Sequence, residues 1–469
     1  MVFTGMHDSN EELTMNRLAS PAAQVNRLQQ EAARTHRIVI VGGGAGGLQL
    51  ATRLGDATRR SGQAAVTLVD RAATHLWKPL LHEVAAGSMD ANAHQLEYAA
   101  QGRWHHFEFQ QGELKGLDRV RKTITVAALD DPEIGEILPQ REIPYDTLVL
   151  AIGSATHFFG TPGADEHALA LDSVEQAERF RRRLLATCVR AQSQLRHDAQ
   201  ARPHIDIAII GGGATGVELA AELRNTAQVL RSYGVHKLDP QRDIGITIIE
   251  AGPRILAALP EKIAAHTTAL LKGLNIQVKS NEKVVRVESE WILMASGKVL
   301  PADLTVWAGG IRVPAVLSDV GLPTNKLGQV IVSQSLQTII DPDIFAFGDC
   351  ASCPWPDKGK TVPPRAQAAH QQARFLYHAL QRRLKGQPLR AFEYHDYGSL
   401  VSLGHFDTVG NLMGKVVGKS LWVGGKLARL LYLSLYRQHL KELHGFMRMS
   451  IDTVGHWLRR KTEPRIKLH

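Results

Sequence analysis

The chain has 469 residues, of which 44% are hydrophobic and 22% charged, so it is an ordinary globular protein with room for two or three domains, and extensive disorder or a fibrous repeat is excluded. Its three cysteines, Cys188, Cys350 and Cys353, exclude a disulfide framework and favour a reducing compartment. The net charge of +9 lies at one end, because residues 411–469 hold twelve Lys or Arg against three acids. A basic tail on a neutral body is not typical of a nucleic-acid groove, so no nucleic-acid partner is expected.

The N-terminal residues 1–35 are polar and rich in Gln, Asn and Ala, without the apolar core of a signal peptide. We expect a mobile or weakly helical arm there. Nowhere does the chain approach the roughly 18 uncharged apolar residues of a membrane-spanning helix. The best candidate, residues 427–440, is interrupted by Arg429 and Arg437, so we expect no membrane span.

The first pattern that carries chemistry is RIVIVGGGAGGLQLATRL. It predicts a strand over residues 37–41, a turn containing Gly42, Gly44 and Gly47, and then a helix rich in Ala and Leu. The next strand, AVTLVD, ends at Asp70. In such a unit the glycines permit a tight turn, close approach of a diphosphate and close packing of helix on strand, while the acid accepts ribose hydroxyls.

A second pattern, DIAIIGGGATGVELAAEL, repeats the first, with Gly211, Gly213 and Gly216 after the predicted strand. Its second strand, ITIIE, ends at Glu250, which lies 34 residues after the third glycine against 23 in the first pattern. The longer gap predicts an elongated helix or an excursion around residues 232–243. One such motif alone is weak evidence, but two complete ones strongly indicate two dinucleotide sites.

Three further strands end in glycine-bearing turns: YDTLVLAIGS at Ala151 to Gly153, LTVWAGG at Gly309 and Gly310, and TIIDPDIFAFGDCA at Gly348 and Asp349. Each alone is consistent with an ordinary buried strand and turn. Their order along the chain, however, resembles that of the flavoproteins with two dinucleotide-binding domains.

This resemblance implies an α/β fold with two Rossmann-like domains, the second inserted in the first, and non-covalent FAD on the first and NADH on the second. The implied divisions are an arm (1–35), an FAD-binding domain (36–165 and 326–395), an NADH-binding domain (166–325) and a C-terminal membrane-associated region (396–469). The residues implied for FAD are Gly42, Gly44, Gly47, Asp70 and Asp349; those for NADH are Gly211, Gly213, Gly216 and Glu250; Gly153, Gly309 and Ala366 are implied beside the cofactors.

The segments HLWKPLLHEVAAG (75–87) and PPRAQAAHQQA (363–373), together with the second glycine motif and the tail, are similar to the bacterial type II NADH:quinone oxidoreductases. The similarity runs from residue 36 to the last residue. It implies that NADH reduces the flavin, which then reduces a ubiquinone-like membrane quinone of a respiratory chain without proton pumping. No calcium loop of acid-x-acid-x-acid-Gly type is present, and no metal site is expected.

The resemblance also implies roles for three polar residues. Glu218 would position the nicotinamide, and Gln367 and Gln371, one helical turn apart, would hydrogen-bond a quinone carbonyl. Without the family pattern, Glu218 could be an acid near a helix N-terminus that interacts with the helix dipole. The two glutamines could then be polar residues on the solvent-exposed face of a helix.

Two alternative functions stay open at this point. Cys350-x-x-Cys353 could be a redox pair in an NAD(P)H-dependent reductase of disulfides or of another soluble acceptor. The pair follows the strand that ends in Gly-Asp, however, and disulfide reductases do not carry their redox cysteines at that position. A flavoprotein acting as an interaction module is the non-enzymatic alternative. Glu250 should repel the 2′-phosphate of NADPH, while Arg254, four residues on, could soften that repulsion.

The tail predicts an amphipathic membrane anchor over residues 421–468. Apolar residues recur near the helical period at Leu427, Leu430, Leu431, Leu435 and Tyr436, with Trp422, Tyr432 and Trp457 available at headgroup level. The cations Lys426, Arg429, Arg437, Lys441 and Arg459 to Lys461 would attract anionic lipid. We therefore expect a peripheral protein on the cytoplasmic face of a bacterial inner membrane. A core helix or a homodimer interface is the alternative use of these apolar residues.

Overall fold

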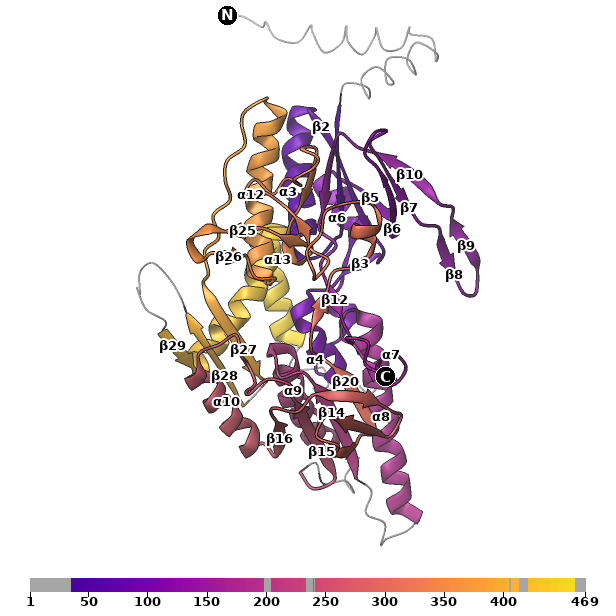
Figure 1. The fold of residues 1–469 in the computed structure, drawn as a ribbon, viewed down its shortest axis with the longest axis vertical. Coiled ribbons are helices and arrows are strands. Elements are labelled where there is room, and N and C mark those ends of the chain that lie inside the picture. Colours follow the sequence, from indigo (N-terminus) through magenta and orange to yellow (C-terminus); the bar gives the residue numbers. More distant parts are fainter. Residues whose placement is uncertain are drawn as a thin grey trace, which may run out of the picture.

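The computed structural model describes residues 35–197, 204–232, 239, 241–404, 406–412 and 421–459. The predicted arm therefore lies, but for Thr35, outside the described residues, as does most of the predicted excursion before Asp243. The fold has two domains stacked along the long axis of the molecule (Figure 1), each built around a five-stranded parallel sheet.

The first sheet has the strand order β23-β11-β1-β2-β5. Its strands are β1 (His36–Val41), β2 (Ala64–Asp70), β5 (Glu108–Gln111), β11 (Thr147–Leu150) and β23 (Ile344–Ala346). Helices α3 (Ala45–Ser61) and α12 (Ala366–Leu384) pack side by side against it. The apolar runs of β1, β11 and β23 are buried on both faces, as expected of the central strands of a parallel sheet, whereas the edge strand β5 is largely polar and partly exposed.

The second sheet has the order β13-β20-β14-β15-β16. Its strands are β13 (Ala168–Leu169), β14 (Ile205–Ile210), β15 (Ile244–Ile249), β16 (Ile276–Lys279) and β20 (Leu304–Trp307), and its helices are α8 (Val174–His197), α9 (Ala214–Ser232) and α10 (Glu261–Gly273). Because β23 of the first sheet follows all of these strands in sequence, the second sheet is inserted in the chain of the first. The long helix α9 accounts for part of the wide gap before Glu250.

Two short strands, β12 (Ala155–Thr156) and β21 (Ile311–Arg312), pair where the chain leaves the first domain and returns. Val313, Leu317 and Leu322 already pack in the core of the first domain. This packing favours a return to the first domain near residue 313, earlier than the boundary at 326 expected from the sequence, so the domain limits stay a proposal.

Both domains also contain smaller sheets and short helices outside the two five-stranded sheets. Antiparallel sheets are formed by β6 (Leu114–Asp118), β7 (Thr123–Val126) and β10 (Arg141–Pro144), by β17 (Val284–Val287), β18 (Trp291–Met294) and β19 (Val299–Pro301), and by the projecting hairpin β8 (Leu129–Asp131) and β9 (Gly135–Leu138). Short pairs join β3 (Thr74–His75) to β4 (Leu96–Glu97), β22 (Val330–Ile331) to β24 (Ala351–Ser352), and β25 (Pro354–Trp355) to β26 (Lys360–Thr361). Short helices are η1 (Lys78–Leu80), α4 (Leu81–Ala86), α5 (Ala91–His94), α6 (Tyr98–His105), α7 (Ala164–His167), α11 (Val316–Asp319), η2 (Gly348–Cys350) and η3 (Pro356–Lys358).

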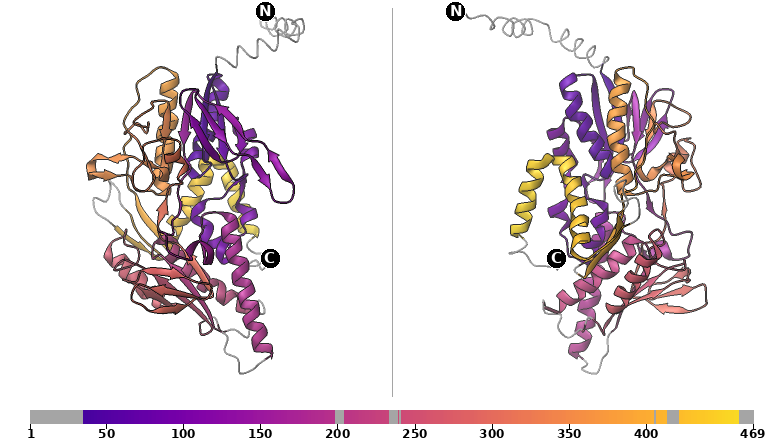
Figure 2. Two further views of the ribbon diagram at one scale, coloured as in Figure 1. Left: turned by 45° about the vertical axis from the view of Figure 1, so that its right-hand side comes forward. Right: turned by 90° about the vertical axis from the view of Figure 1, so that its left-hand side faces the viewer.

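The C-terminal region joins the two domains. Its three-stranded sheet consists of β27 (Gly398–Leu403), β28 (Asp407–Leu412) and β29 (Leu421–Gly424), and Val401, Leu403 and Val409 pack in the core of the second domain. Helix α13 (Gly425–Arg459) follows and bends at Gly445, whose φ of 77° and ψ of 170° are not helical. Its first arm packs on the body, with Leu443 in the core of the first domain, and Figure 2 shows the second arm turning away. Among the described helices, none is both long and apolar enough to cross a bilayer.

Candidate active site

The first glycine loop connects β1 to α3 through very close contacts. Gly42 has a φ of 105°, and a Cβ atom on it would lie 2.3 Å from the carbonyl oxygen of Ala151. A Cβ on Gly47 would lie 1.8 Å from the oxygen of Gly42. At Gly44, by contrast, a Cβ would meet nothing within 4 Å. The loop therefore leaves open space in front of the helix N-terminus, where backbone N–H groups and the helix dipole favour a diphosphate.

Asp70, at the end of β2, folds back onto this loop. Its carboxylate accepts hydrogen bonds from the backbone N–H of Gly43 at 2.6 Å and of Ala72 at 2.8 Å. Tyr98 donates its hydroxyl proton to the carbonyl of Gly43 at 2.7 Å. Burial raises the pKa of the Asp70 carboxyl above its usual value. Asp70 thus lies beside the expected ribose position and shapes the loop that would hold the diphosphate.

The second glycine loop has the same construction. A Cβ on Gly211 would lie 2.6 Å from Cα of Gly309, one on Gly216 would lie 2.1 Å from the oxygen of Gly211, and one on Gly213 would meet nothing within 4 Å. Gly309 is therefore part of the loop's packing, which explains a glycine at this strand end. Each domain thus has one glycine loop that leaves open space at the N-terminus of a helix.

Glu250 borders the second loop. Its carboxylate accepts hydrogen bonds from the backbone N–H of Gly212 and of Gly252, both at 2.7 Å. The guanidinium of Arg254 donates to the carbonyls of Leu256, Ala257 and Leu259 at 3.0 to 3.1 Å. These three carbonyls hold the Arg254 guanidinium on the segment that follows Glu250.

Asp349 lies where the ends of β11 and β23 meet. Its carboxylate accepts a hydrogen bond from the Ser154 hydroxyl at 2.9 Å, next to Gly153, which has a φ of 70°. Lys78 donates to the carbonyl of Ser154 at 2.9 Å and forms an ion pair with Asp172 at 2.9 Å. The open space at Gly44, the Asp70 carboxylate and this polar strand edge fit the diphosphate and ribose groups of FAD. The Lys78–Asp172 pair was not singled out from the sequence.

Gln367 and Gln371 lie in the first turns of α12, which begins at Ala366. Both side chains bind the segment that leads into β27. Gln367 donates to the carbonyl of Gly398 at 2.9 Å and accepts from the N–H of Tyr397 at 3.1 Å. Gln371 donates to the carbonyl of His395 at 2.8 Å and accepts from its N–H at 3.0 Å. In this structure the two amides hold that segment, and contact with a quinone would require them to share or exchange these partners.

Glu218, in the second turn of α9, is only 7% exposed. It accepts a hydrogen bond from the N–H of Ser402 in β27 at 3.0 Å, and its other carboxylate oxygen lies 3.8 Å from Nδ1 of His82. Burial, followed by the charge of Glu83, raises the pKa of Glu218 to about 8. Glu218 is therefore a buried carboxyl that is largely protonated at neutral pH, which a solvated helix-terminal acid would not be.

Cys350 and Cys353 are free thiols and fully buried. The thiol of Cys350 donates to the carbonyl of Phe347 at 3.2 Å, and that of Cys353 lies 3.6 Å from the carbonyl of Pro354. Burial raises the pKa of both thiols to about 12. Because a redox dithiol needs an accessible thiolate, these features favour a structural role.

A histidine and aromatic cluster joins α13 to the first domain. Nε2 of His75 lies 3.0 Å from Nε2 of His439, and the Trp77 ring stacks on Tyr436 with centroids 5.5 Å apart. His370 of α12 packs against His439 at 5.2 Å between centroids. Tyr436, expected on the lipid side, is therefore part of an internal contact, as in the core-helix alternative.

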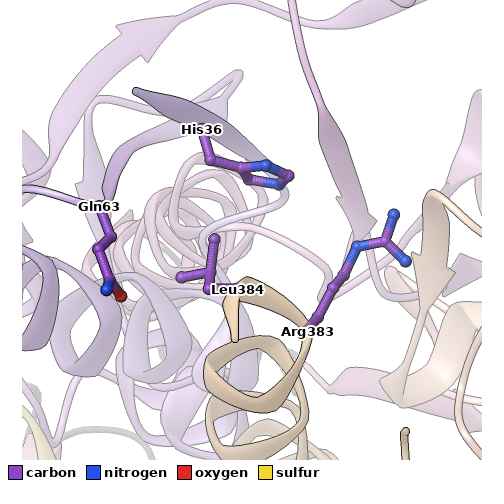
Figure 3. Close-up of a pocket in the computed structure, with 4 residues that line it drawn as sticks. All are labelled: His36, Gln63, Arg383 and Leu384. Carbon is purple, nitrogen blue, oxygen red and sulfur yellow. The ribbon is translucent and has the colours of Figure 1, made fainter. Parts of the chain in front are cut away.

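A pocket of about 500 Å³ lies elsewhere, lined by His36, Gln63, Arg383 and Leu384 (Figure 3). His36 begins β1, so this pocket is at the opposite end of the strand from the glycine loop. Arg383 pairs with Asp343, and His36 hydrogen-bonds the Thr147 hydroxyl at 2.8 Å. The polar groups of this pocket contact residues at the ends of strands of the first sheet, and none of the four lining residues belongs to the candidate site.

Comparison with known proteins agrees with this geometry. Residues 36–373 match the family described as pyridine nucleotide-disulphide oxidoreductase. The chain is 42% identical over 443 residues to a type II NADH:quinone oxidoreductase of Haemophilus influenzae, covering 92% of this chain and 99% of that protein. It is 28% identical to the protein of the same name from Staphylococcus aureus, with 82% and 91% covered. Among solved structures, NDH2 of Plasmodium falciparum in complex with NADH superposes with a TM-score of 0.76 at 21% identity, with 92% of this chain and 100% of that chain covered, which supports the fold.

Proposed function

We propose that this chain, which belongs to the type II NADH:quinone oxidoreductases within the pyridine nucleotide-disulphide oxidoreductase family, oxidises NADH and reduces a membrane quinone without pumping protons. The first glycine loop would hold FAD, which would supply the chemistry of accepting a hydride and passing electrons on. One observation supports the assignment of the site. The N–H of Ser402 in β27 donates to the carboxylate of Glu218 from the second domain, while Gln367 and Gln371 from the first domain hold the segment leading into β27. The residue assigned to the nicotinamide and the two residues assigned to the quinone thus contact the same strand or the segment that leads into it.

The individual roles follow from these positions. Gly42, Gly44, Gly47, Asp70, Gly153, Asp349 and Ala366 would hold FAD, and Gly211, Gly213, Gly216, Glu250 and Gly309 would hold NADH. Glu218 would lie beside the nicotinamide. Gln367 and Gln371 would set the position of the quinone through the segment 395–398, in addition to any direct hydrogen bond.

We also propose a peripheral attachment to the cytoplasmic face of a bacterial inner membrane, through the second arm of α13. On this arm Met447, Ile451, Val454 and Leu458 recur at intervals of four, three and four residues and are all more than half exposed. Phe446, next to the bend, is 70% exposed. Such an apolar stripe on a helix in a basic region suits the plane of an anionic bilayer.

The proposed activity is tested with the purified flavoprotein, NADH and a short-chain quinone. We expect turnover, and we expect the Cys350→Ala, Cys353→Ala double variant to keep its kcat, because both thiols are buried and protonated, although it should lose about 1–3 kcal/mol of stability. Absence of quinone turnover with flavin bound would contradict the proposal. Loss of kcat in the double variant with its flavin and fold intact would favour the disulfide-reductase alternative.

NADH should be preferred over NADPH by at least about 100-fold in kcat/KM, because a 2′-phosphate would face the Glu250 carboxylate, while backbone carbonyls hold the Arg254 guanidinium. Glu250→Gln should narrow this ratio about tenfold or more by removing the repulsion. Arg254→Gln serves as the matched control and should leave the ratio unchanged. Equal efficiencies with both donors in the unmodified enzyme would refute this role of Glu250.

A further inference from the structure

Two helices of the first domain end next to one another at the protein surface. Helix α3 carries Arg59 and Arg60 in its last turn, and α6 carries Arg103 in its last turn. The guanidinium of Arg59 donates to Nε2 of His106, the residue that follows α6, at 2.8 Å. The C-terminal ends of α3 and α6 therefore form one surface, and that surface is rich in arginine.

An exposed tryptophan belongs to the same surface. Trp104, which follows Arg103 in α6, is 50% exposed. The guanidinium of Arg448, on the second arm of α13, lies over the Trp104 ring at 5.1 Å from its centroid, within the range of a cation–π contact. Arg448 directly follows Met447, the first residue of the exposed apolar stripe on that arm. The surface thus meets the proposed membrane-binding arm. We call Arg59, Arg60, Arg103, Trp104 and Arg448 the α6 patch.

The positive charges of the α6 patch are not neutralised by carboxylates of the described chain. All four arginines are exposed, and none of them forms an ion pair within the residues that the structure describes. Two acids lie close by in the sequence, and each has a partner of its own. Asp56 pairs with His105 at 3.0 Å, and Glu108 accepts a hydrogen bond from the Gln110 amide. The arginines are therefore available to an external anion.

Helix dipoles alone do not explain this arrangement. The C-terminus of a helix favours cations in its last turn, which would account for the arginines of α3 and α6. Arg448, however, lies in the first turn after the bend at Gly445, and the dipole disfavours a cation at the start of a helical arm. Nor does a helix dipole explain why Trp104 is half exposed. A ligand outside the chain accounts for both features.

The chemistry of the α6 patch matches the surface of an anionic bilayer. Guanidinium groups bind phosphate oxygens through paired hydrogen bonds, and tryptophan prefers the level of lipid headgroups. Beside the patch, the side chains of Met447, Ile451, Val454 and Leu458 are exposed. A bilayer offers phosphate groups next to hydrocarbon, which fits arginines next to an apolar stripe. A nucleic acid offers phosphate without hydrocarbon, so it fits this surface less well.

We propose that the α6 patch binds the phosphate groups of anionic phospholipids while the second arm of α13 lies in the same bilayer. The first domain then touches the membrane directly at the ends of α3 and α6, and the contact of Arg448 with Trp104 holds the second arm against it. Two contacts fix the orientation of the protein on the bilayer, which a single helix lying in the membrane plane would leave free to rotate. The inference rests on the proposed membrane attachment and adds a second lipid contact to it.

The first test measures binding of the full-length flavoprotein to phosphatidylcholine vesicles with and without phosphatidylglycerol. An arginine near an anionic surface strengthens binding about fivefold, so Arg103→Gln, Arg448→Gln should weaken binding to the phosphatidylglycerol vesicles about 25-fold. Arg103→Lys, Arg448→Lys keeps both charges and should restore most of the binding. The matched control is Arg182→Gln, Arg183→Gln, which removes two exposed arginines from α8 in the second domain and should bind like the unmodified protein. Flavin content and Tm verify that every variant is folded.

The second test determines whether Trp104 lies at headgroup level. Phosphatidylglycerol with a spin label on its headgroup quenches the fluorescence of tryptophans near the membrane surface. Trp104→Phe should lose part of this quenching. Trp291→Phe is the matched control and should lose none, because Trp291 is 37% exposed but lies on β18 of the second domain.

Each outcome supports or contradicts a defined part of the inference. Unchanged vesicle binding in Arg103→Gln, Arg448→Gln, or unchanged quenching in Trp104→Phe, would overturn the α6 patch as a lipid contact. An equal loss of binding in the α8 control would show that binding follows net charge alone, and would overturn it as well. These results leave the second arm of α13 in place, because Ile451→Asp, Val454→Asp tests that arm separately. Absence of vesicle binding by the unmodified flavoprotein would instead contradict the proposed attachment itself, together with this inference.

Discussion

Gly44→Ala should strip the protein of flavin without unfolding it, and Gly213→Ala should raise the KM for NADH while flavin stays bound. Both positions have open space where the new methyl group would lie, so neither substitution strains the folded chain. The same space is where a diphosphate would meet the backbone. An intruding methyl group there costs about 1–3 kcal/mol, which weakens binding about 10- to 100-fold.

The matched controls are the third glycines of the two loops. A Cβ on Gly47 or Gly216 would collide with a backbone carbonyl at 1.8 or 2.1 Å, so these alanine variants should lower Tm whether or not a ligand binds. Flavin absorbance per protein, the KM for NADH and thermal unfolding separate the two classes. Normal flavin content in Gly44→Ala would show that the diphosphate does not lie over this loop.

The glycine loops could be predicted because their signal is local. Each strand, turn and helix is adjacent in sequence, and β1 and β14 begin within one residue of the positions expected from their apolar runs. The insertion of the second sheet was implied by the resemblance to the flavoproteins with two dinucleotide-binding domains. The final strand before Asp349 is shorter than its apolar run suggested, since Ile339 and Ile340 are exposed ahead of the turn at Pro342.

Contacts between distant segments could not be predicted in this way. The Lys78–Asp172 pair and the His75–His439 contact join residues far apart in the chain, and no local periodicity signals them. The bonds of Gln367 and Gln371 to segment 395–398 are of the same kind. They depend on where β27 returns between the domains, which is a property of the tertiary fold.

The tail shows why helical periodicity alone is ambiguous. A helix that lies between a protein core and a membrane is apolar on more than one face. In the first arm of α13, Ala428 and Leu440 are buried and Tyr436 stacks on Trp77, whereas Leu430 and Leu435 are exposed. Beyond the bend at Gly445, the Arg448 guanidinium lies over the Trp104 ring at 5.1 Å from its centroid, while Met447, Ile451, Val454 and Leu458 are exposed. The expected anchor is therefore narrowed to the second arm and the exposed side of the first, while residues 460–469 lie outside the described part of the chain.

The Ile451→Asp, Val454→Asp double variant should release the protein from anionic liposomes while retaining flavin and NADH oxidation with a soluble short-chain quinone. Both side chains are more than half exposed on the second arm, so the fold should tolerate the change. Burying each in lipid is worth up to about 1.5–3 kcal/mol, and two added negative charges would be repelled by the bilayer, so binding should fall at least about 100-fold.

A matched control is available in the first domain, because Ile134 and Ile137 on the β8–β9 hairpin are also at least half exposed. Ile134→Asp, Ile137→Asp adds the same charge and removes the same kind of side chain, yet it should leave liposome binding nearly unchanged. Point substitutions are preferable to deleting residues 421–468, since the first arm of α13 contributes Leu443 and His439 to buried contacts and its loss would disturb the first domain.

Sedimentation with vesicles of anionic phospholipid measures the binding of both variants, and size-exclusion chromatography tests the alternative that the apolar stripe of the second arm joins two copies of the chain. If the second-arm variant still pellets as well as the unmodified chain, the anchor lies elsewhere. A dimer that falls apart in that variant without loss of vesicle binding would identify the stripe as a subunit interface instead.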